Sequence, residues 1–198
     1  MAARYAGYDV LAKWDTPAFN DATRRALAER LALHGRRFFT QAEFDLIHLV
    51  AERLVPQPDR PEPIPLAALL DDYFAEGRAG GYRLDGVPHL PEAWRIGLAG
   101  VAAEAERRHH APFAALSPEA RDEVLAAVQA GDVDPAAWRG VDPALFFRNT
   151  LLKITVGLYY AHPAAWSEIG FGGPASPQGY VRLGPDDRDP WEAAETRP

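Results

Sequence analysis

The fold is decided by residues 142–160, which read DPALFFRNTLLKITVGLYY. Asp142 followed by Pro143 is typical of a helix start, because an aspartate N-cap and a proline in the first helical position are both favoured there. A helix that is apolar almost all round belongs at the centre of a helical bundle. The apolar positions follow helical spacing, with one central face and a second set that widens it: Phe147, Leu151, Ile154 and Leu158, then Phe146, Leu152, Val156 and Tyr159.

Amphipathic helical patterns also precede this segment. Thr40 followed by Glu43 has the spacing of a capping box, and Ser117-Pro118 is a second strong helix start. No segment alternates apolar and polar residues as a half-buried strand would. The sequence therefore predicts an all-α, single-domain bundle of about six helices. The expected helices before the last one cover residues 22–34, 40–55, 66–76, 91–110 and 118–130.

Composition divides the chain into four expected regions. An N-terminal arm with four aromatic residues precedes the first helix, and an acidic, proline-containing tail ends the chain. Residues 56–65 hold five prolines and are interpreted as a stiff surface connector, because the helical pattern resumes at once. The expected regions are an arm at 1–21, a helical domain at 22–161, a Gly/Pro-rich contact loop at 162–184 and a tail at 185–198.

Composition also excludes several classes of function. The chain has 198 residues, a formal net charge of −7 and no cysteine. The negative charge argues against nucleic acid or an anionic membrane surface as a partner. Without cysteine the chain cannot supply thiolate zinc sites, iron–sulfur clusters or a C-x-x-C-H haem attachment. No apolar run reaches the ~18 residues that a membrane-spanning helix needs.

The segment after the last helix, residues 162–180, is rich in glycine, proline and aromatic residues. The six glycines and prolines from Gly170 to Gly179 cannot continue a helix, and Phe171 and Tyr180 are costly to leave in water. These observations favour two interpretations equally. The segment is either a contact surface for another protein or a cap over the chain's own core.

Aromatic residues divide by their setting in the sequence. Trp94 and Tyr159 lie on apolar helix faces and are expected in the core. Trp14, Trp166, Phe171 and Tyr180 lie in segments interpreted as irregular, and aromatic residues are enriched at interface hot spots. We expect these four at a protein interface.

The best enzyme-like pattern is Glu106-x-x-His109, which would pair with Asp45-x-x-His48. Paired Glu-x-x-His motifs on two helices build dinuclear metal sites in helical bundles. Asp45 lies almost opposite the apolar face of its helix, which favours solvated carboxylates with histidines at the edge of the core. His162 beside Trp166 resembles a general base, but no nucleophile accompanies it, and a backbone hydrogen bond at the helix end is the preferred interpretation.

Four sequence blocks together resemble one protein family. Each block matches a short pattern of the family, and the four occur in the family's order along the chain. The patterns are F-T-x-x-E within 37–44, R-L-V-P with its last three residues at 54–56, W-R-x-G-L within 94–100, and P-F-x-x-L-S-P at 112–118. With the Gly/Pro block at 170–180, these resemble the gluconate 2-dehydrogenase subunit 3 family, the small non-catalytic subunit of bacterial flavoprotein dehydrogenase complexes.

The resemblance implies an accessory role for the chain. Such a subunit binds, stabilises and helps mature an FAD-dependent catalytic subunit of the glucose–methanol–choline (GMC) oxidoreductase type, which acts on sugars or alcohols, in some complexes beside a cytochrome c subunit. It implies no catalytic residue and no cofactor in this chain. With the aromatic residues above, it implies a partner interface formed by Trp14, His162, Trp166, Phe171, Gly172, Gly173, Pro174 and Tyr180.

Two alternatives stay open beside this interpretation. One is a free-standing helical metalloenzyme that uses Glu106 and His109, and the other is an escort chaperone that binds the flavoprotein only during assembly.

The location of the protein is expected from association alone. Family members that escort exported flavoproteins begin with a twin-arginine signal, whereas this chain starts with an aromatic arm in which no signal peptide is readable. Residues 36–39, RRFF, are followed by polar residues, so they are interpreted as a helix approach. We expect a periplasmic location by association with the complex, with a cytoplasmic one open.

Overall fold

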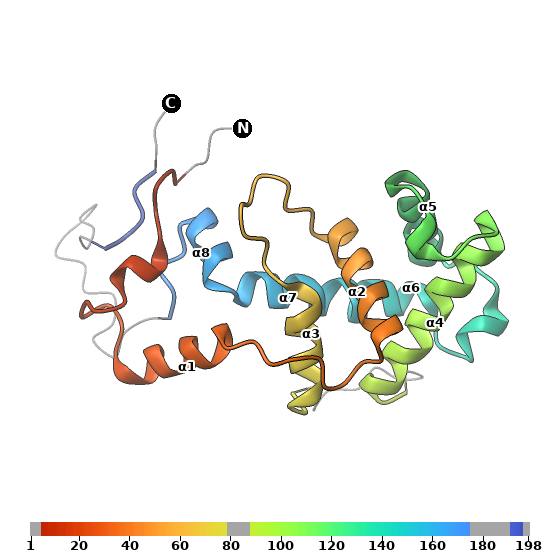
Figure 1. Cartoon of the computed structure of the whole chain (residues 1–198), viewed down its shortest axis with the longest axis horizontal. Helices are drawn as coiled ribbons and strands as arrows, with labels where there is room; N and C mark the ends of the chain where they lie inside the picture. The colour runs from red at the N-terminus through yellow and green to blue at the C-terminus, as the bar shows by residue number, and fades with distance from the viewer. Residues whose placement is uncertain (1–4, 79–87, 175–190, 196–198) are drawn as a thin grey trace. The chain divides into compact units, whose positions relative to one another are not determined.

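The computed structural model describes residues 5–78, 88–174 and 191–195 of the chain (Figure 1). Within these ranges every regular element is helical and no strand occurs. The prediction of an all-α fold is therefore confirmed. Among the same residues, no helix is both long and apolar enough to cross a membrane.

Contacts along the chain group it into two compact units. The smaller unit combines residues 1–33 with 159–198, and the larger unit holds residues 34–158. Helix α1 (Asp21–Leu31) thus belongs with the N-terminal arm, whereas the ranges expected from composition place it in the helical domain.

The larger unit is built mainly from long helices. Helix α4 (Leu90–His109) packs against α2 (Gln41–Leu54), against α5 (Pro118–Ala130) and against the short turns that follow α4 and α5 in the chain. The helices of this unit before residue 142 are α2 (Gln41–Leu54), α3 (Leu66–Ala75), α4 (Leu90–His109) and α5 (Pro118–Ala130), joined by the 3₁₀ turns η2 (Phe113–Ala115) and η3 (Pro135–Trp138) (Figure 1).

The helix starts read from the sequence are present in the structure. Thr40 and Glu43 form a reciprocal capping box at the start of α2. The Ser117 hydroxyl accepts the N–H of Ala120 at 3.3 Å, and the Asp142 carboxylate accepts the N–H of Leu145 at 2.9 Å. These caps satisfy backbone donors that a helix leaves unpaired in its first turn.

Helix α4 carries two glycines that let aromatic rings approach its backbone. A Cβ atom at Gly97 would overlap the ring of Phe146, and one at Gly100 would lie 2.6 Å from Cε2 of Trp138. Both rings are almost completely buried, as is Trp94 on the same helix. The glycines of the W-R-x-G-L block are therefore required by packing, and the prediction that Trp94 lies in the core is confirmed.

The last long helical segment is not a regular α-helix, contrary to the prediction. It opens as α6 (Pro143–Leu145), widens into a π-helix, η4 (Phe146–Leu152), and continues as α7 (Lys153–Ala161). Helix α7 enters the smaller unit at Tyr159, which is buried as expected.

The π-helical turns change which side chains of this segment are buried. The expected face continues from Leu151 to Ile154 and Leu158, but these two are only partly buried, and Thr155 is buried instead. A π-helix has more residues per turn than an α-helix, so the apolar spacing shifts by one residue. The Thr155 hydroxyl donates to the carbonyl oxygen of Leu151 at 2.7 Å, which satisfies it inside the core.

The smaller unit has its own core. Its elements are the 3₁₀ turn η1 (Val10–Lys13), helix α1 and helix α8 (Pro163–Ile169). Its buried core consists of Val10, Ala18, Phe19, Leu27 and Trp166.

Helix α8 corrects the expectation that the chain is irregular from His162 onward. His162 is its N-cap, and Pro163 occupies the first helical turn. Gly170 ends it in the left-handed conformation, with φ of 68°. Trp166 therefore lies on a helix rather than in a loop, and the irregular segment starts at Gly170.

Candidate partner-binding surface

The N-terminal arm packs on α8 and on the residues that follow it. The backbone N–H of Val10 donates to the Ser167 hydroxyl at 3.0 Å, and the Lys13 ammonium donates to the carbonyl oxygen of Gly172. Lys13 also lies 5.0 Å from the ring centroid of Phe19. Burial lowers the pKa of Lys13, an effect that the carboxylate of Glu192 opposes. The arm thus joins residues more than 150 positions apart in the chain.

Trp166 is the largest side chain of this small core. Only 4% of its surface is exposed, and its indole N–H donates to the carbonyl oxygen of Tyr160 at 2.6 Å. The Phe171 ring meets it edge-on, with centroids 5.4 Å apart. Trp166 therefore packs against other side chains, such as Phe171, and exposes little surface of its own to a partner.

The glycines of the Gly/Pro block pack against this chain's own side chains. A Cβ atom at Gly170 would lie 2.6 Å from Cζ of Tyr5, and one at Gly173 would lie 3.3 Å from Cζ3 of Trp166. Both glycines also have positive φ. These contacts support the interpretation of this segment as a cap over the chain's own core, while its role as a partner interface stays a prediction.

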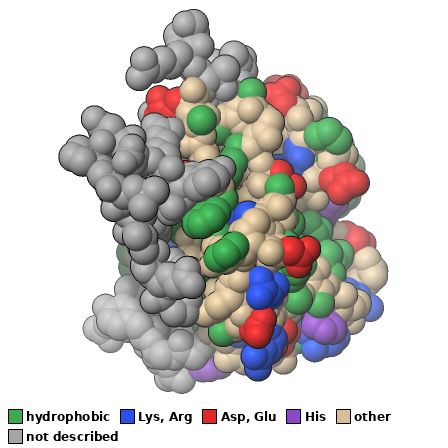
Figure 2. Space-filling view, turned by 90° about the vertical axis from the view of Figure 1, so that its left-hand side faces the viewer, with side chains coloured by type: hydrophobic (Ala, Val, Ile, Leu, Met, Phe, Trp, Pro, Cys, Tyr) green, Lys and Arg blue, Asp and Glu red, His purple; other side chains and the backbone are tan. Residues whose placement is uncertain are grey.

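Large exposed apolar side chains nevertheless occur beside Trp166. Phe171 is 43% exposed, Ile169 is 49% exposed, and Tyr160 is 49% exposed. Figure 2 shows hydrophobic side chains at the surface among charged ones on one face of the molecule. Tyr160 lies in α7, Ile169 ends α8 and Phe171 follows it, and exposed apolar side chains on neighbouring segments are a feature of interaction sites. We refer to Tyr160, Ile169 and Phe171 as the α8 surface.

The other expected interface residues differ in accessibility. Pro174 is exposed, and Trp14 and His162 are partly exposed. The His162 Nδ1 accepts the backbone N–H of Ala164 at 3.2 Å, so its side chain caps α8, in line with the preferred interpretation of this residue. Tyr180 lies outside the described residues.

The structure gives the candidate metal ligands other partners. His109 Nε2 lies 3.6 Å from a carboxylate oxygen of Glu123, and His48 Nε2 lies 3.3 Å from one of Glu52. Asp45 is exposed and accepts a hydrogen bond from Gln41 at 2.7 Å. Each of these contacts is made within one helix or with a neighbouring one, and none joins the two expected motifs.

A different group of ligand-type side chains was not anticipated from the sequence. Within the described ranges, His34, Asp72 and Glu76 alone place three such atoms within 4.8 Å of one another. A guanidinium already occupies this place, because Arg37 Nη2 lies 2.6 Å from Asp72 and 3.4 Å from Glu76. Burial raises the pKa of Asp72, but hydrogen bonds from Arg37 and His34 outweigh it and leave that pKa below its ordinary value. The group is an ion-pair network that joins α3 to the segment before α2.

Comparison with known proteins identifies the family. The family model of gluconate 2-dehydrogenase subunit 3 matches residues 41–173, about two thirds of the chain. No match occurs among curated proteins or among solved structures. The chain belongs to the gluconate 2-dehydrogenase subunit 3 family, as the four sequence blocks predict.

Proposed function

We propose that this member of the gluconate 2-dehydrogenase subunit 3 family is a non-catalytic accessory subunit. It binds, stabilises and helps mature an FAD-dependent catalytic subunit of the GMC oxidoreductase type, in some complexes beside a cytochrome c subunit. The observation that carries this proposal is the family match over 41–173, since the family is named for a numbered subunit of a dehydrogenase. Catalysis and FAD belong to the partner in this proposal.

The α8 surface is the proposed contact with the catalytic subunit. Phe171 combines an exposed ring with an edge-on contact to the buried Trp166, which restricts its orientation. An aromatic side chain that is ordered before binding loses little conformational entropy when a partner covers it. Interface energy is concentrated in such anchors. Tyr160 and Ile169 would widen the apolar contact around it.

The test is a native pull-down of the tagged chain from its own host. A larger co-eluting protein with flavin absorbance in a fixed ratio to this chain is the expected result. A colourless chain that elutes alone would contradict a permanent subunit, and flavoprotein found only in growing cells would favour the escort chaperone. Iron or zinc in a lone chain would favour a metalloenzyme.

The proposed location follows from the same association. A subunit that stays with an exported flavoprotein would be recovered with it in the periplasmic fraction. Fractionation of cells that express the tagged chain, with flavin absorbance read in each fraction, tests this part separately. Recovery of the complex with the cytoplasmic fraction would contradict the periplasmic location and leave the accessory role intact.

A further inference from the structure

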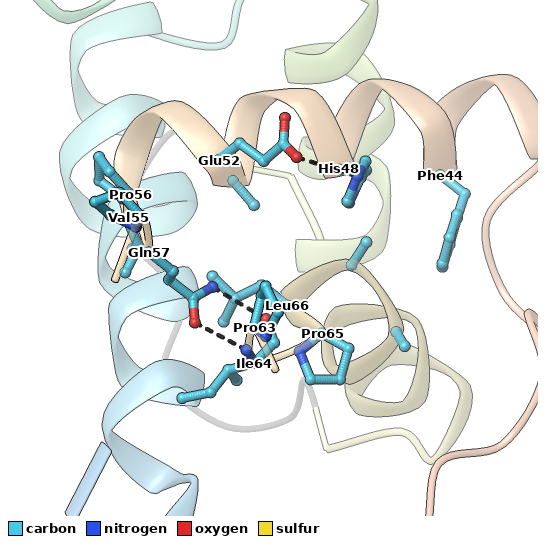
Figure 3. A pocket seen from close by; sticks show the side chains of 14 residues that line it. Phe44, His48, Glu52, Val55, Pro56, Gln57, Pro63, Ile64, Pro65 and Leu66 are labelled. Atoms are coloured by element: carbon cyan, nitrogen blue, oxygen red, sulfur yellow. Dashed lines mark hydrogen bonds and ion pairs between the residues drawn. The ribbon is translucent and has the colours of Figure 1, made fainter. Parts of the chain in front are cut away.

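A hollow in the larger unit lies between α2, the proline-rich segment 56–65 and the start of α3 (Figure 3). Its volume is about 560 Å³. That is room for several side chains and falls within the range of ligand sites, roughly 300–1,000 Å³. We call it the α2–α3 groove.

The walls of the groove are rigid before anything binds. Pro56, Pro58, Pro63 and Pro65 line it, and proline fixes the backbone φ angle. The Gln57 side chain ties the segment together, since its amide accepts the Ile64 N–H at 2.8 Å and donates to the Ile64 carbonyl at 3.1 Å. Figure 3 shows both bonds between the Gln57 side chain and the backbone of Ile64. A preformed groove costs little ordering when it is filled.

The floor of the groove is apolar. Ala51, Ile64, Leu66 and Ala67 line it and are at least 96% buried within the chain. The side-chain amide of Gln57 already hydrogen-bonds to the Ile64 backbone, so these bonds stay within the proline-rich segment. An occupant must therefore present an apolar body to this floor.

One acidic side chain lines the groove, and two more lie on the adjoining proline-rich segment. Glu52 lines it and is 54% exposed, at 3.3 Å from His48. Asp59 and Glu62 are exposed on the proline-rich segment, where Arg60 is the single basic residue. The Glu52 carboxylate in the lining, with the carboxylates of Asp59 and Glu62 on the adjoining segment, favours a positively charged group near the mouth.

We propose that the α2–α3 groove binds a segment of the catalytic partner that carries a bulky apolar side chain next to a lysine or arginine. This inference rests on the proposed function and adds a second contact, in the larger unit. Small-molecule sites fix orientation with a few enclosed polar groups. Here the two most polar side chains of the lining, His48 and Glu52, are 62% and 54% exposed, which is the pattern of an interface rim around an apolar centre.

The test compares the flavoprotein captured by full-length tagged variants with that captured by the unchanged chain. Ala68→Phe fills the groove from its partly exposed lining, and Glu52→Lys reverses the charge of its rim. Each is expected to lower the captured flavoprotein by about tenfold or more. Ala103→Phe and Glu106→Lys, both exposed positions on α4, are the matched controls and should capture as much as the unchanged chain.

The outcomes separate this inference from the proposed function. If the unchanged chain captures flavoprotein and both groove variants capture it equally well, the groove inference is wrong and the accessory role stands. If the unchanged chain captures none, both are wrong. Because Ala68→Phe can disturb packing, helical circular dichroism is compared, and Glu52→Lys decides the outcome where Ala68→Phe loses helix.

A photo-crosslinking amino acid at position 68 identifies the occupant. A cross-link to the flavoprotein, at a peptide with a basic residue beside an apolar one, is expected. A cross-link only to a second copy of this chain, or to a small molecule, would overturn the inference.

Discussion

The buried carboxylate of Asp71 on α3 accepts the backbone N–H of Phe39 at 2.9 Å. The same carboxylate accepts the N–H groups of Arg37 at 2.5 Å and Phe38 at 3.1 Å, and Asp71 is 1% exposed. One side chain therefore satisfies three successive backbone donors just before α2. The F-T-x-x-E block is held to α3 by this contact, 32 positions away in the chain.

Asp71→Ala is expected to destabilise the larger unit strongly. It leaves three backbone donors without their acceptor, of which the one at Phe39 is buried and those at Arg37 and Phe38 are partly buried. An unsatisfied buried donor costs roughly 1–3 kcal/mol, so a loss of at least about 1–3 kcal/mol in the free energy of unfolding is expected. Urea denaturation measures it. Asp59→Ala, at an exposed position, is the control and should change the free energy little. Equal stability of the two variants would contradict the role given to Asp71.

Stability is expected to fall in acid, and Glu104 should account for part of the loss. Burial raises the pKa of this 2% exposed carboxyl, but Arg107 and Arg108 outweigh it, so its pKa in the folded protein lies below its ordinary value. A depressed carboxyl pKa contributes stability that is present above the unfolded-state pKa, about 4.3, and is lost as pH falls through the folded-state value. The pKa of Asp72 is depressed as well, so it acts in the same direction.

Unfolding free energy measured by urea titration between neutral pH and about pH 3 tests this dependence. Glu104→Gln should be less stable at neutral pH and should show a flatter decline in acid than the unchanged chain. An identical decline in both proteins would show that Glu104 does not titrate with folding. Glu106→Gln, two positions further along α4 and exposed, is the control.

Gly97→Ala and Gly100→Ala are expected to overpack the core. Added Cβ atoms would collide with the rings of Phe146 and Trp138, and overpacking of this kind costs about 1–3 kcal/mol. Gly157→Ala is the matched control, because nothing lies within 4 Å of its Cβ position in α7. That change should raise stability by about 0.5–1 kcal/mol, since alanine favours the helix. Thermal unfolding that ranks the three variants differently would refute this packing account.

Phe171→Ala is expected to weaken capture of the catalytic partner by about 2 kcal/mol or more while helix content is unchanged. Leu33→Ala is the control, because Leu33 is an equally exposed apolar residue outside the α8 surface. The affinity of each variant for the purified flavoprotein is the quantity to measure. Equal affinity of the two variants would remove Phe171 from the contact.

Trp166→Ala is expected to act differently from Phe171→Ala. Its side chain belongs to the buried core of the smaller unit, and removal of a buried tryptophan costs about 3–5 kcal/mol in stability. Loss of protection of α1 and α8 in hydrogen exchange should therefore accompany any loss of binding. Unchanged protection would indicate that Trp166 contacts the catalytic partner directly.

The helix starts could be predicted because each depends on neighbouring residues. The Thr40–Glu43 box and the caps at Ser117 and Asp142 satisfy donors within three positions of themselves. The short helix α8 escaped prediction because seven residues between Pro163 and Gly170 are too few to show helical spacing. The proline-rich segment could be read as stiff, but not as the wall of a groove.

By itself the sequence determined the all-α fold, most helix starts and the family, since these rest on local hydrogen bonds, apolar spacing and short patterns in fixed order. Only the tertiary structure decided which residues that are distant in the sequence contact one another. Lys13 meets Gly172, Asp71 holds Phe39, and Arg37 occupies the one described group of metal-type ligands. These contacts join positions from 32 to 159 residues apart. Their partners are chosen by how helices pack, which no local pattern records.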